Sequence, residues 1–527
     1  MRKNILAVSI AAMIGGLGFA GAASAGTVIS TGATATTLEV SPTGVGHILL
    51  VPYFSTQNGN VSLLNIVNTD TINGKAVKLR YRGAANSDDI YDITVFLSPG
   101  DMWSANVSQV DGVSKLTTND NSCTLPAEKA AINTAFGTSR LAKVGAPANK
   151  AGTLEGYIEI LNMADVAPGT ALFTSIKHVK GVAPCATMAS QKTDLADAAA
   201  ATARGYANPT GGLMANWTIL NLSKAGSFTG EATAVVAVDN TGVSRPANIV
   251  FSPQEEDAAV SMATAATLTA DPLLAQGKLV AKNYDFPDLS TPYVGVITPI
   301  NQAHMLSHAL ATASITNEYM TSPDVSFATD WTFSMPSRRY NVALDYAAAT
   351  PATAAVYAAG AKYFTVANTA VVDGKICVAS KFDDLAYYDT EENQKNTTPG
   401  GYVVSPKPVN AAPGLAFCGE ASVLAFNKSF ADATAPTGVL GALIARQGLT
   451  MTKASSASEF YTDGWMSLMT PGNAQAATVV PVGAAGNLGL PVIGHAFAKA
   501  LGTSASLGGI WKHRTNTAVV APAAVAP

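Results

Sequence analysis

Two histidines four positions apart are the first candidates for chemistry in this chain. On a helix, His304 and His308 would share one face, where two imidazole nitrogens can bind a transition metal. The run between them is Met-Leu-Ser, so it lacks the glutamate of the metalloprotease pattern His-Glu-x-x-His. We therefore favour a structural or exposed pair over a metal site.

Carboxylates are densest in one later segment. The acids of this cluster are Asp383, Asp384, Asp389, Glu391 and Glu392. Calcium takes roughly 6–8 oxygen ligands, so an acidic loop can hold it. The spacing does not match an EF-hand, and we favour a solvated acidic loop with calcium as the alternative. Apart from calcium, the sequence indicates no cofactor.

Three further acids, Asp88, Asp89 and Asp92, lie beside a run that we expect to be a strand. A glycoside hydrolase needs two carboxyl groups held across a sugar bond. A chain with 36 acids offers such pairs in many places, so we favour exposed turn acids. The chain after residue 25 contains no GxSxG elbow, P-loop or dinucleotide fingerprint. We therefore expect no catalytic residue and a protein that is not an enzyme.

Basic residues form two small groups. Lys78, Arg80 and Arg82 alternate along one expected strand, and Arg338 and Arg339 form a second spot. They could bind an acidic surface polymer, but a solvent-exposed strand face is the favoured interpretation. Charged residues make up only 13% of the chain, against roughly 25% in ordinary domains. No dense basic run is present, so we expect no nucleic-acid partner.

The first 25 residues have the pattern of a cleavable export signal. Residues 2–3 are basic, residues 5–20 are mostly apolar, and Ala-Ser-Ala at 23–25 is a small-x-small cleavage site before Gly26. A permanent membrane anchor is the alternative, but the glycines and the small-residue end argue against it. No later apolar run reaches the roughly 20 residues of a membrane helix, so we expect no transmembrane segment in the mature chain.

The four cysteines fit an exported protein. An even count outside the cytoplasm indicates disulfide bonds. Four cysteines allow three pairings, and we prefer Cys123–Cys185 with Cys377–Cys418 because each bond would then close one half of the chain. The chain-entropy model gives roughly 4 kcal/mol for each loop. A metal site is the alternative, but the chain has no CxxC motif and no Cys/His cluster.

Most of the secondary structure elements that hold these residues are predicted to be strands. Apolar and polar residues alternate over residues 77–82, 93–97 and 331–335, and residues 157–161 form a further expected strand. Asn-Gly or Asp-Gly pairs at 58–59, 73–74 and 373–374 separate β-prone runs and accept the positive φ angles of tight hairpins. These signals predict a mostly β fold of antiparallel β-sandwich (Ig-like) domains.

Helices and domain limits follow from composition. Two short helices are expected, over residues 194–204 and 304–318. An acidic segment with a proline near residue 255 marks a soft boundary between β-rich domains at 26–255 and 256–515. Residues 516–527 are almost entirely Ala, Val and Pro, which indicates a disordered tail.

Several short stretches, in order along the chain, resemble a family of exported bacterial proteins. They are HILLVPYF at 47–54, NIVNT at 65–69, NEY at 317–319, TDW at 329–331, PSRRY at 336–340, CGE at 418–420 and LPVIG at 490–494. Members of this family are usually labelled only "cell surface protein". The resemblance implies export and surface association, and it implies no reaction.

These features predict an exported cell-surface structural or interaction protein that can self-assemble. Its partners would be other copies of itself or other surface components, and its location the surface, the medium or the periplasm. The alternative is a soluble extracytoplasmic carbohydrate- or ligand-binding protein, which exposed aromatic residues on one sheet face would favour. A secreted hydrolase ranks lower, and a pocket holding two acids with shifted pKa values would favour it.

Overall fold

The computed structural model describes most of the chain between residues 27 and 516. The described residues are 27–29, 32, 34–138, 141, 150–192, 195, 197–224, 226–251, 299–344, 353–379, 386–391, 394–395, 416–427, 435–449, 452–453, 456–470, 489–501 and 506–516. The predicted signal peptide, the boundary near residue 255 and residues 517–527 of the predicted tail lie outside them. Asn516, where the predicted tail begins, ends the last strand.

The first sandwich consists of two sheets that face each other. Sheet I has the order β2 (Thr37–Val40), β14 (Thr233–Val238), β3 (Ile48–Ser55), β10 (Glu155–Val166), β5 (Gly74–Gly83), β6 (Asp89–Leu97) and β9 (Cys123–Leu125), and β11 (Tyr206–Ala207) also pairs with β10. Sheet II has the order β13 (Gly226–Glu231), β12 (Leu213–Asn221), β4 (Asn60–Asn68), β7 (Met102–Val110) and β8 (Val113–Thr117).

Period-two patterning explains this layer. Burial alternates along β4 and β12 because only one face of sheet II meets the core. Val77, Leu79 and Tyr81 of β5 face that core, as the alternation predicts, and Trp103 of β7 packs into it. The strands β5, β6 and β10 are buried along their whole length, so the other face of sheet I is covered as well.

The second sandwich has the same two-layer form. Sheet III has the order β24 (Gln394–Lys395), β23 (Ala386–Asp389), β30 (Asp463–Met469), β17 (Ser314–Met320) and β34 (Arg514–Asn516). Sheet IV has the order β27 (Arg446–Leu449), β26 (Ala421–Phe426), β18 (Phe327–Ser334), β32 (His495–Leu501) and β33 (Ser506–Lys512). Trp331 and Phe333 of β18 lie in the core between the two sheets. The pair β26–β27 is parallel, while the other pairs of these four sheets are antiparallel.

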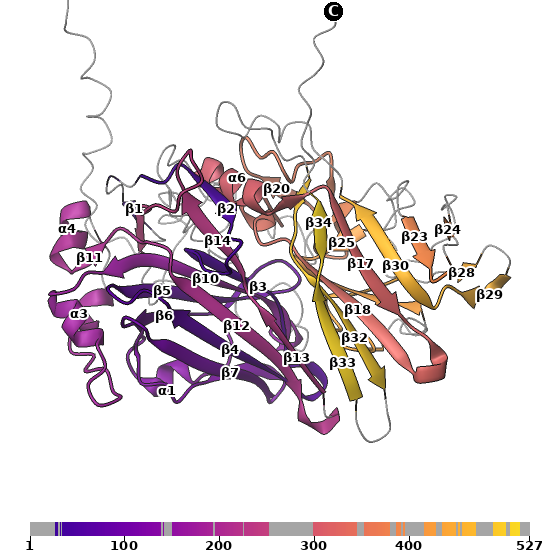
Figure 1. The fold of residues 1–527 in the computed structure, drawn as a ribbon, viewed down its shortest axis with the longest axis horizontal. Coiled ribbons are helices and arrows are strands. Elements are labelled where there is room, and N and C mark those ends of the chain that lie inside the picture. Colours follow the sequence, from indigo (N-terminus) through magenta and orange to yellow (C-terminus); the bar gives the residue numbers. More distant parts are fainter. Residues whose placement is uncertain are drawn as a thin grey trace, which may run out of the picture.

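The two sandwiches lie side by side and share a core (Figure 1). The face of sheet IV that points away from Trp331 packs against the first sandwich, where Val423 and Phe497 join the core of sheets I and II. Helix α6 (Pro299–Leu310) crosses the top of this junction in Figure 1, and its Leu306 and Leu310 belong to the same apolar cluster as Ile48 of β3. The chain therefore forms one continuous body across the two halves.

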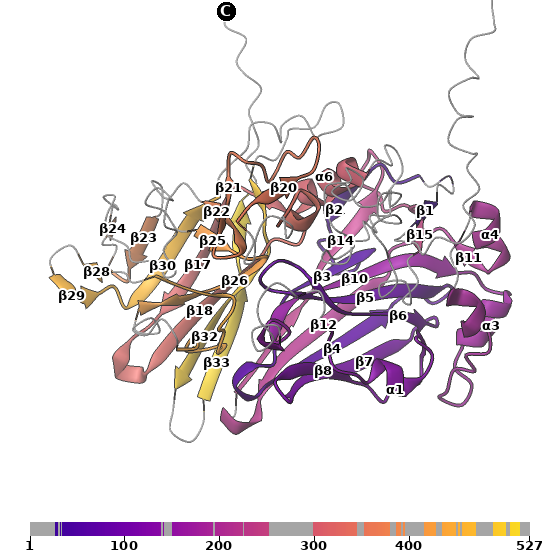
Figure 2. The same cartoon turned by 180° about the vertical axis from the view of Figure 1, so that it is seen from behind.

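Smaller elements complete the described chain. The minor sheets pair β1 (Thr27–Ile29) with β15 (Ile249–Phe251), β16 (Ala311–Thr312) with β31 (Leu490–Pro491), β19 (Val342–Leu344) with β20 (Ala355–Tyr357), β28 (Thr452–Lys453) with β29 (Ser456–Phe460), and β21 (Thr369–Val372) with β22 (Lys375–Ala379) and β25 (Ala416–Cys418). Figure 2 shows the β21–β22–β25 sheet above β26 in the view from behind. The short helices are α1 (Lys129–Ile132), α3 (Ala171–Ile176), α4 (Ala198–Ala203), η1 (Gln57–Gly59), η2 (Met188–Lys192), η3 (Leu222–Lys224), η7 (Pro323–Val325) and η8 (Arg338–Tyr340). None of the helices in the described ranges is long and apolar enough to cross a bilayer.

The predicted antiparallel β-sandwich fold with few short helices is confirmed, but two of the three predicted hairpins are wrong. Asp373-Gly374 joins the paired strands β21 and β22, and both residues have positive φ. The pairs at 58–59 and 73–74 instead carry the chain between sheets I and II, so the strands they connect do not pair. Asp111-Gly112 forms a tight β7–β8 hairpin that the same dipeptide rule would have found.

Both predicted helices are shorter than expected. Helix α4 begins only at Ala198, because the side chain of Asp197 caps it by accepting a hydrogen bond from the Ala200 amide. Helix α6 ends at Leu310, and the remaining predicted residues enter β16 and β17. Ile315 and Thr316 are β-branched, and burial alternates along β17, so strand pairing wins over helical patterning there.

Candidate functional site

The four cysteines form the two preferred disulfides. Cys123 on β9 bonds Cys185, and Cys377 on β22 bonds Cys418, its cross-strand neighbour on β25. The bonds close loops with sequence separations of 62 and 41 residues. One bond lies in each half of the chain, as predicted.

Replacing Cys377 and Cys418 together by alanine should lower the free energy of unfolding by about 4 kcal/mol, because the unfolded chain regains the freedom of the closed loop. Equilibrium urea unfolding of the mature protein measures this change. A reducing agent should lower the urea concentration at the unfolding midpoint of the unchanged protein as well. An unaltered midpoint for the double variant would show that this bond adds nothing to stability.

The basic residues predicted on a strand face are buried, so both sequence-based interpretations of them are wrong. Lys78, Arg80 and Arg82 are at most 1% exposed. Lys78 Nζ lies 3.0 Å from Asp92 Oδ2, and Arg82 Nε lies 3.0 Å from Glu159 Oε2. They face away from the sandwich core, between the apolar cluster under α3 and α4 and the cluster under α6. This face therefore meets neither solvent nor a polymer.

The two acids of β6 form ion pairs with these bases. The prediction of exposed turn acids is wrong. Asp88, Asp89 and Asp92 are at most 7% exposed. The β5–β6 register places Arg80 opposite Asp92 and Arg82 opposite Asp89, and opposite charges on neighbouring strands stabilise a sheet. The two charged patterns that the sequence shows separately thus form one buried network.

The second basic spot is buried as well. Arg338 and Arg339 lie on η8 and are 1% and 3% exposed. Arg338 Nε lies 2.6 Å from Glu420 Oε2, and Arg338 Nη1 donates to the carbonyl of Gly419 at 2.8 Å. The PSRRY and CGE stretches are therefore joined in space by this ion pair.

His304 and His308 share a region of α6 near Tyr363. The His304 ring lies 6.3 Å from the Tyr363 ring, and His308 Nδ1 lies 3.4 Å from the Tyr363 hydroxyl. Burial lowers the pKa of His304 to about 4. Among the residues that the structure describes, these histidines belong to no group of three metal-ligating side chains. Packing against Tyr363 accounts for the pair.

Only part of the acidic cluster is described. Asp389 ends β23, and its Oδ1 accepts a hydrogen bond of 2.8 Å from the amide of Glu391 in the following turn. Asp383, Asp384 and Glu392 lie outside the described residues. The calcium hypothesis remains a prediction.

Two buried carboxylates that sequence reasoning missed hold the junction of the sandwiches. Residues 437–445, which we call the junction loop, run between the two halves. Glu155 Oε1 of β10 accepts the amides of residues 443, 444 and 445 at 3.2, 2.5 and 2.9 Å, and its Oε2 accepts the Tyr53 hydroxyl at 2.6 Å. Asp330 Oδ2 of β18 accepts the amides of residues 439 and 440 at 3.2 and 2.8 Å. Each half thus supplies one carboxylate to the same loop.

Side chains of the first sandwich also bind carbonyls of the junction loop. Asn58 Nδ2 donates to the Gly441 carbonyl at 2.9 Å, and Asn60 Nδ2 donates to the Leu440 carbonyl at 2.8 Å. Complete burial raises the pKa of Asp330 to about 6. Because Asp330 binds the backbone amides of residues 439 and 440 and the side chain of Thr437, we infer a structural role for it.

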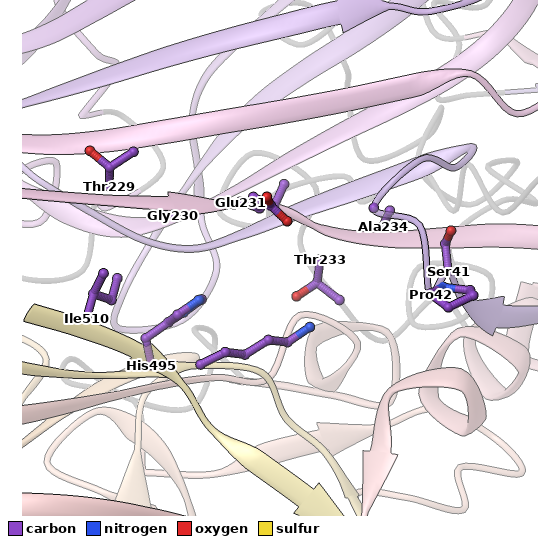
Figure 3. Close-up of a pocket in the computed structure, with 12 residues that line it drawn as sticks. Ser41, Pro42, Thr229, Gly230, Glu231, Thr233, Ala234, His495 and Ile510 are labelled. Carbon is purple, nitrogen blue, oxygen red and sulfur yellow. The ribbon is translucent and has the colours of Figure 1, made fainter.

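A cavity of about 290 Å³ lies at the junction (Figure 3). We call it the junction pocket. Its polar side chains come from both halves: Ser41, Thr229, Glu231 and Thr233 from the first sandwich, and His495 and Lys512 from the second. Figure 3 shows His495 and Ile510 extending from sheet IV toward Glu231 and Thr233.

His495 is a buried polar residue of the junction pocket. It is 6% exposed, and its ring packs edge-on against Trp217 at 5.5 Å between centroids. Burial first, and then the nearby Lys512 ammonium, lowers its pKa to about 4, so the imidazole is neutral at pH 7. Its Nδ1 is buried and makes no hydrogen bond within the described structure. Close packing fixes this wall, since a side chain at Gly230 would overlap the Trp217 ring.

An aromatic pair lies on the outer face of sheet III. The rings of Tyr388 on β23 and Trp465 on β30 stack at 4.3 Å with a 16° interplanar angle, and Trp465 is 40% exposed. Glu318 of β17 is the next residue in this cross-strand row, and Arg514 of β34 lies at the end of the adjacent row. Gly464 permits the pairing, because a side chain there would overlap the Tyr388 carbonyl. We call this row the aromatic face.

Comparison with family models, with curated proteins and with solved structures found no match to this chain. The resemblance to exported surface proteins therefore remains a prediction.

Proposed function

We propose that the mature chain works outside the cytoplasm as a cell-surface structural or interaction protein. The observation that carries the proposal is the junction, where one hydrophobic core and two buried carboxylates join the sandwiches into a single body. A surface component must hold its shape without chaperones or an energy supply, and this architecture supports that demand. The two disulfides also favour an oxidising compartment.

The chemistry of the described residues agrees with a non-enzymatic role. Ion pairs such as Arg82 with Glu159 and Arg338 with Glu420 are buried within the fold. Asp330, the acid with a pKa raised to about 6, binds backbone amides of the junction loop. These groups stabilise the body, which favours the surface protein over the hydrolase.

Fractionation of producing cells tests this proposal. Shearing releases surface material, and sedimentation of the sheared, periplasmic and medium fractions then shows where the mature chain is and whether it assembles. The proposal predicts recovery in the sheared fraction, and fast sedimentation there would add self-assembly. Recovery as a small species in the periplasm alone would contradict it.

The aromatic face favours a second function at the cell surface, namely carbohydrate binding. An exposed Trp465 beside Glu318 combines a ring face with a hydrogen-bonding side chain, as sugar recognition requires. Exposed aromatic residues on one sheet face favour a carbohydrate-binding protein, and Trp465 is 40% exposed on sheet III.

Replacing Trp465 by alanine should weaken binding of the mature protein to cell-wall polysaccharide at least about tenfold, since the buried area of an indole dominates such a contact. Affinity electrophoresis in polysaccharide-containing gels measures the change. Leu507→Ala, which removes a leucine that is 78% exposed on β33, is the matched control and should bind normally. Absence of binding by the unchanged protein, or equal binding by the two variants, would contradict this function.

A further inference from the structure

We propose that the junction pocket binds a small zwitterion of the amino-acid class, with its carboxylate toward Lys512 and its ammonium toward Glu231 and His495. This inference goes beyond the proposed surface role, because it assigns a soluble ligand to a site between the two sandwiches. It is carried by the cavity, by its two unlike charges and by one buried polar atom without a partner.

The cavity has the size and construction of a small-molecule site. Its volume of about 290 Å³ lies at the lower end of ligand pockets and leaves room for a small solute. Its walls come from strands of both sandwiches and from the turn at residues 41–44. Ile510 supplies an apolar wall, while Thr229 and Thr233 add hydroxyl groups.

The charges at the cavity select a ligand with both signs. Glu231 and Lys512 line the pocket and are exposed, so one acidic and one basic side chain border it. In the described part of the chain, the Glu231 carboxylate and the Lys512 ammonium form no ion pair with each other within 4.0 Å. A simple anion would leave the carboxylate of Glu231 beside it, and a simple cation would meet Lys512. A zwitterion satisfies both groups.

His495 supplies the third contact. Leaving a buried polar atom without a hydrogen bond costs about 1–3 kcal/mol of stability. A ligand that donates a hydrogen bond to His495 Nδ1 would recover this free energy. The ring is neutral at pH 7, and in the tautomer with Nε2 protonated its Nδ1 accepts a hydrogen bond. An ammonium group carries three donors, enough for Nδ1 and for Glu231 together. The Trp217 contact holds the imidazole in place for this role.

Calorimetric titration of the full mature protein tests the assignment. The probes are the common amino acids, added singly, with the matching carboxylic acid and the matching amine for any that binds. At least one amino acid is expected to bind, and each single-charge analogue should bind at least about tenfold more weakly. Equal affinity for an analogue, or no binding by any amino acid, would overturn the proposal.

Variants locate the site. Glu231→Gln and Lys512→Gln each remove one charge of the junction pocket with little change of volume, and each should weaken binding at least about tenfold. Glu128→Gln and Lys129→Gln are matched exposed controls beside α1, and they should bind as the unchanged protein does. Circular dichroism checks that every variant is folded. Normal binding by folded Glu231→Gln and Lys512→Gln would place the ligand elsewhere and overturn the proposal.

Discussion

Replacing Glu155 by alanine is expected to lower the free energy of unfolding by about 3–5 kcal/mol. The change removes one carboxylate and leaves four donors without their acceptor, namely the Tyr53 hydroxyl and the amides of residues 443, 444 and 445. Glu155 itself is fully buried, so water cannot replace it readily. Equilibrium denaturation with urea measures the loss.

Two controls separate the junction from a general effect of removing a glutamate. Glu155→Gln keeps the side-chain volume and one acceptor oxygen, so its loss of stability should be smaller. Glu128→Ala removes an exposed glutamate and should change the free energy of unfolding by no more than about 0.5 kcal/mol. Equal stability of Glu155→Ala and Glu128→Ala would show that the Glu155 contacts do not hold the junction loop.

Acidification from pH 7 to pH 5 is expected to lower the free energy of unfolding by several kcal/mol. Burial lowers the pKa of four histidines from 6.5, to about 4 for His47, His304 and His495 and to about 3 for His513. The unfolded chain therefore binds protons first as the pH falls. Each histidine stabilises the fold fully above pH 6.5 and loses about 2 kcal/mol of that contribution by pH 5.

Buried acids oppose this trend. Burial raises the pKa of Asp330 to about 6, so the folded state takes up its proton first and acidification to pH 5 returns about 1 kcal/mol. Burial also raises the pKa of Asp165 and of Glu420, whose partners Lys75 and Arg338 act in the opposite direction. We expect the four histidines together to outweigh these acids. Denaturant unfolding at several pH values between 4 and 7.5 measures the net slope.

His495→Phe tests the histidine contribution at one position. Phenylalanine keeps the ring that packs on Trp217, and it leaves no hydrogen bond of His495 Nδ1 unmade. The variant should lose about 2 kcal/mol less than the unchanged protein between pH 7 and pH 5. An unchanged pH slope would contradict the assignment of this stability to the buried neutral imidazole.

The sequence was most informative where one face of a strand meets one core. Alternation placed Val77, Leu79 and Tyr81 toward the sandwich interior, and it did the same for Trp331 and Phe333. Cysteine counting with one bond in each half gave the observed pairing. Both features can be predicted without knowing the tertiary structure. Strand alternation is a local pattern, and the cysteine pairing follows from dividing the chain into two halves.

The same alternation failed for the charged face of β5. Period two tells which side chains share a face, but it does not tell what covers that face. Lys78, Arg80 and Arg82 therefore appeared exposed, whereas sheet I is covered on both sides. Pairing of residues 74–83 with 89–97 in a hairpin would have set Arg80 against Asp92 and revealed the buried network.

The junction could not be predicted from local pattern at all. Glu155 binds amides up to 290 residues away along the chain, and Asp330 binds amides about 110 residues away. Every residue except proline has a backbone amide, so the sequence does not indicate which amides Glu155 and Asp330 bind. His495 gave no signal either, since its pocket exists only where the two sandwiches meet.

Labelling of intact producing cells with a membrane-impermeant amine reagent tests whether the chain is a folded protein at the cell surface. Mass spectrometry then reports which lysines are modified. We expect modification of the exposed Lys180 on intact cells and protection of the buried Lys75 and Lys78 until the protein is denatured. Labelling of Lys180 only after the cells are broken would contradict the surface location, and rapid labelling of Lys78 on intact cells would contradict the buried network.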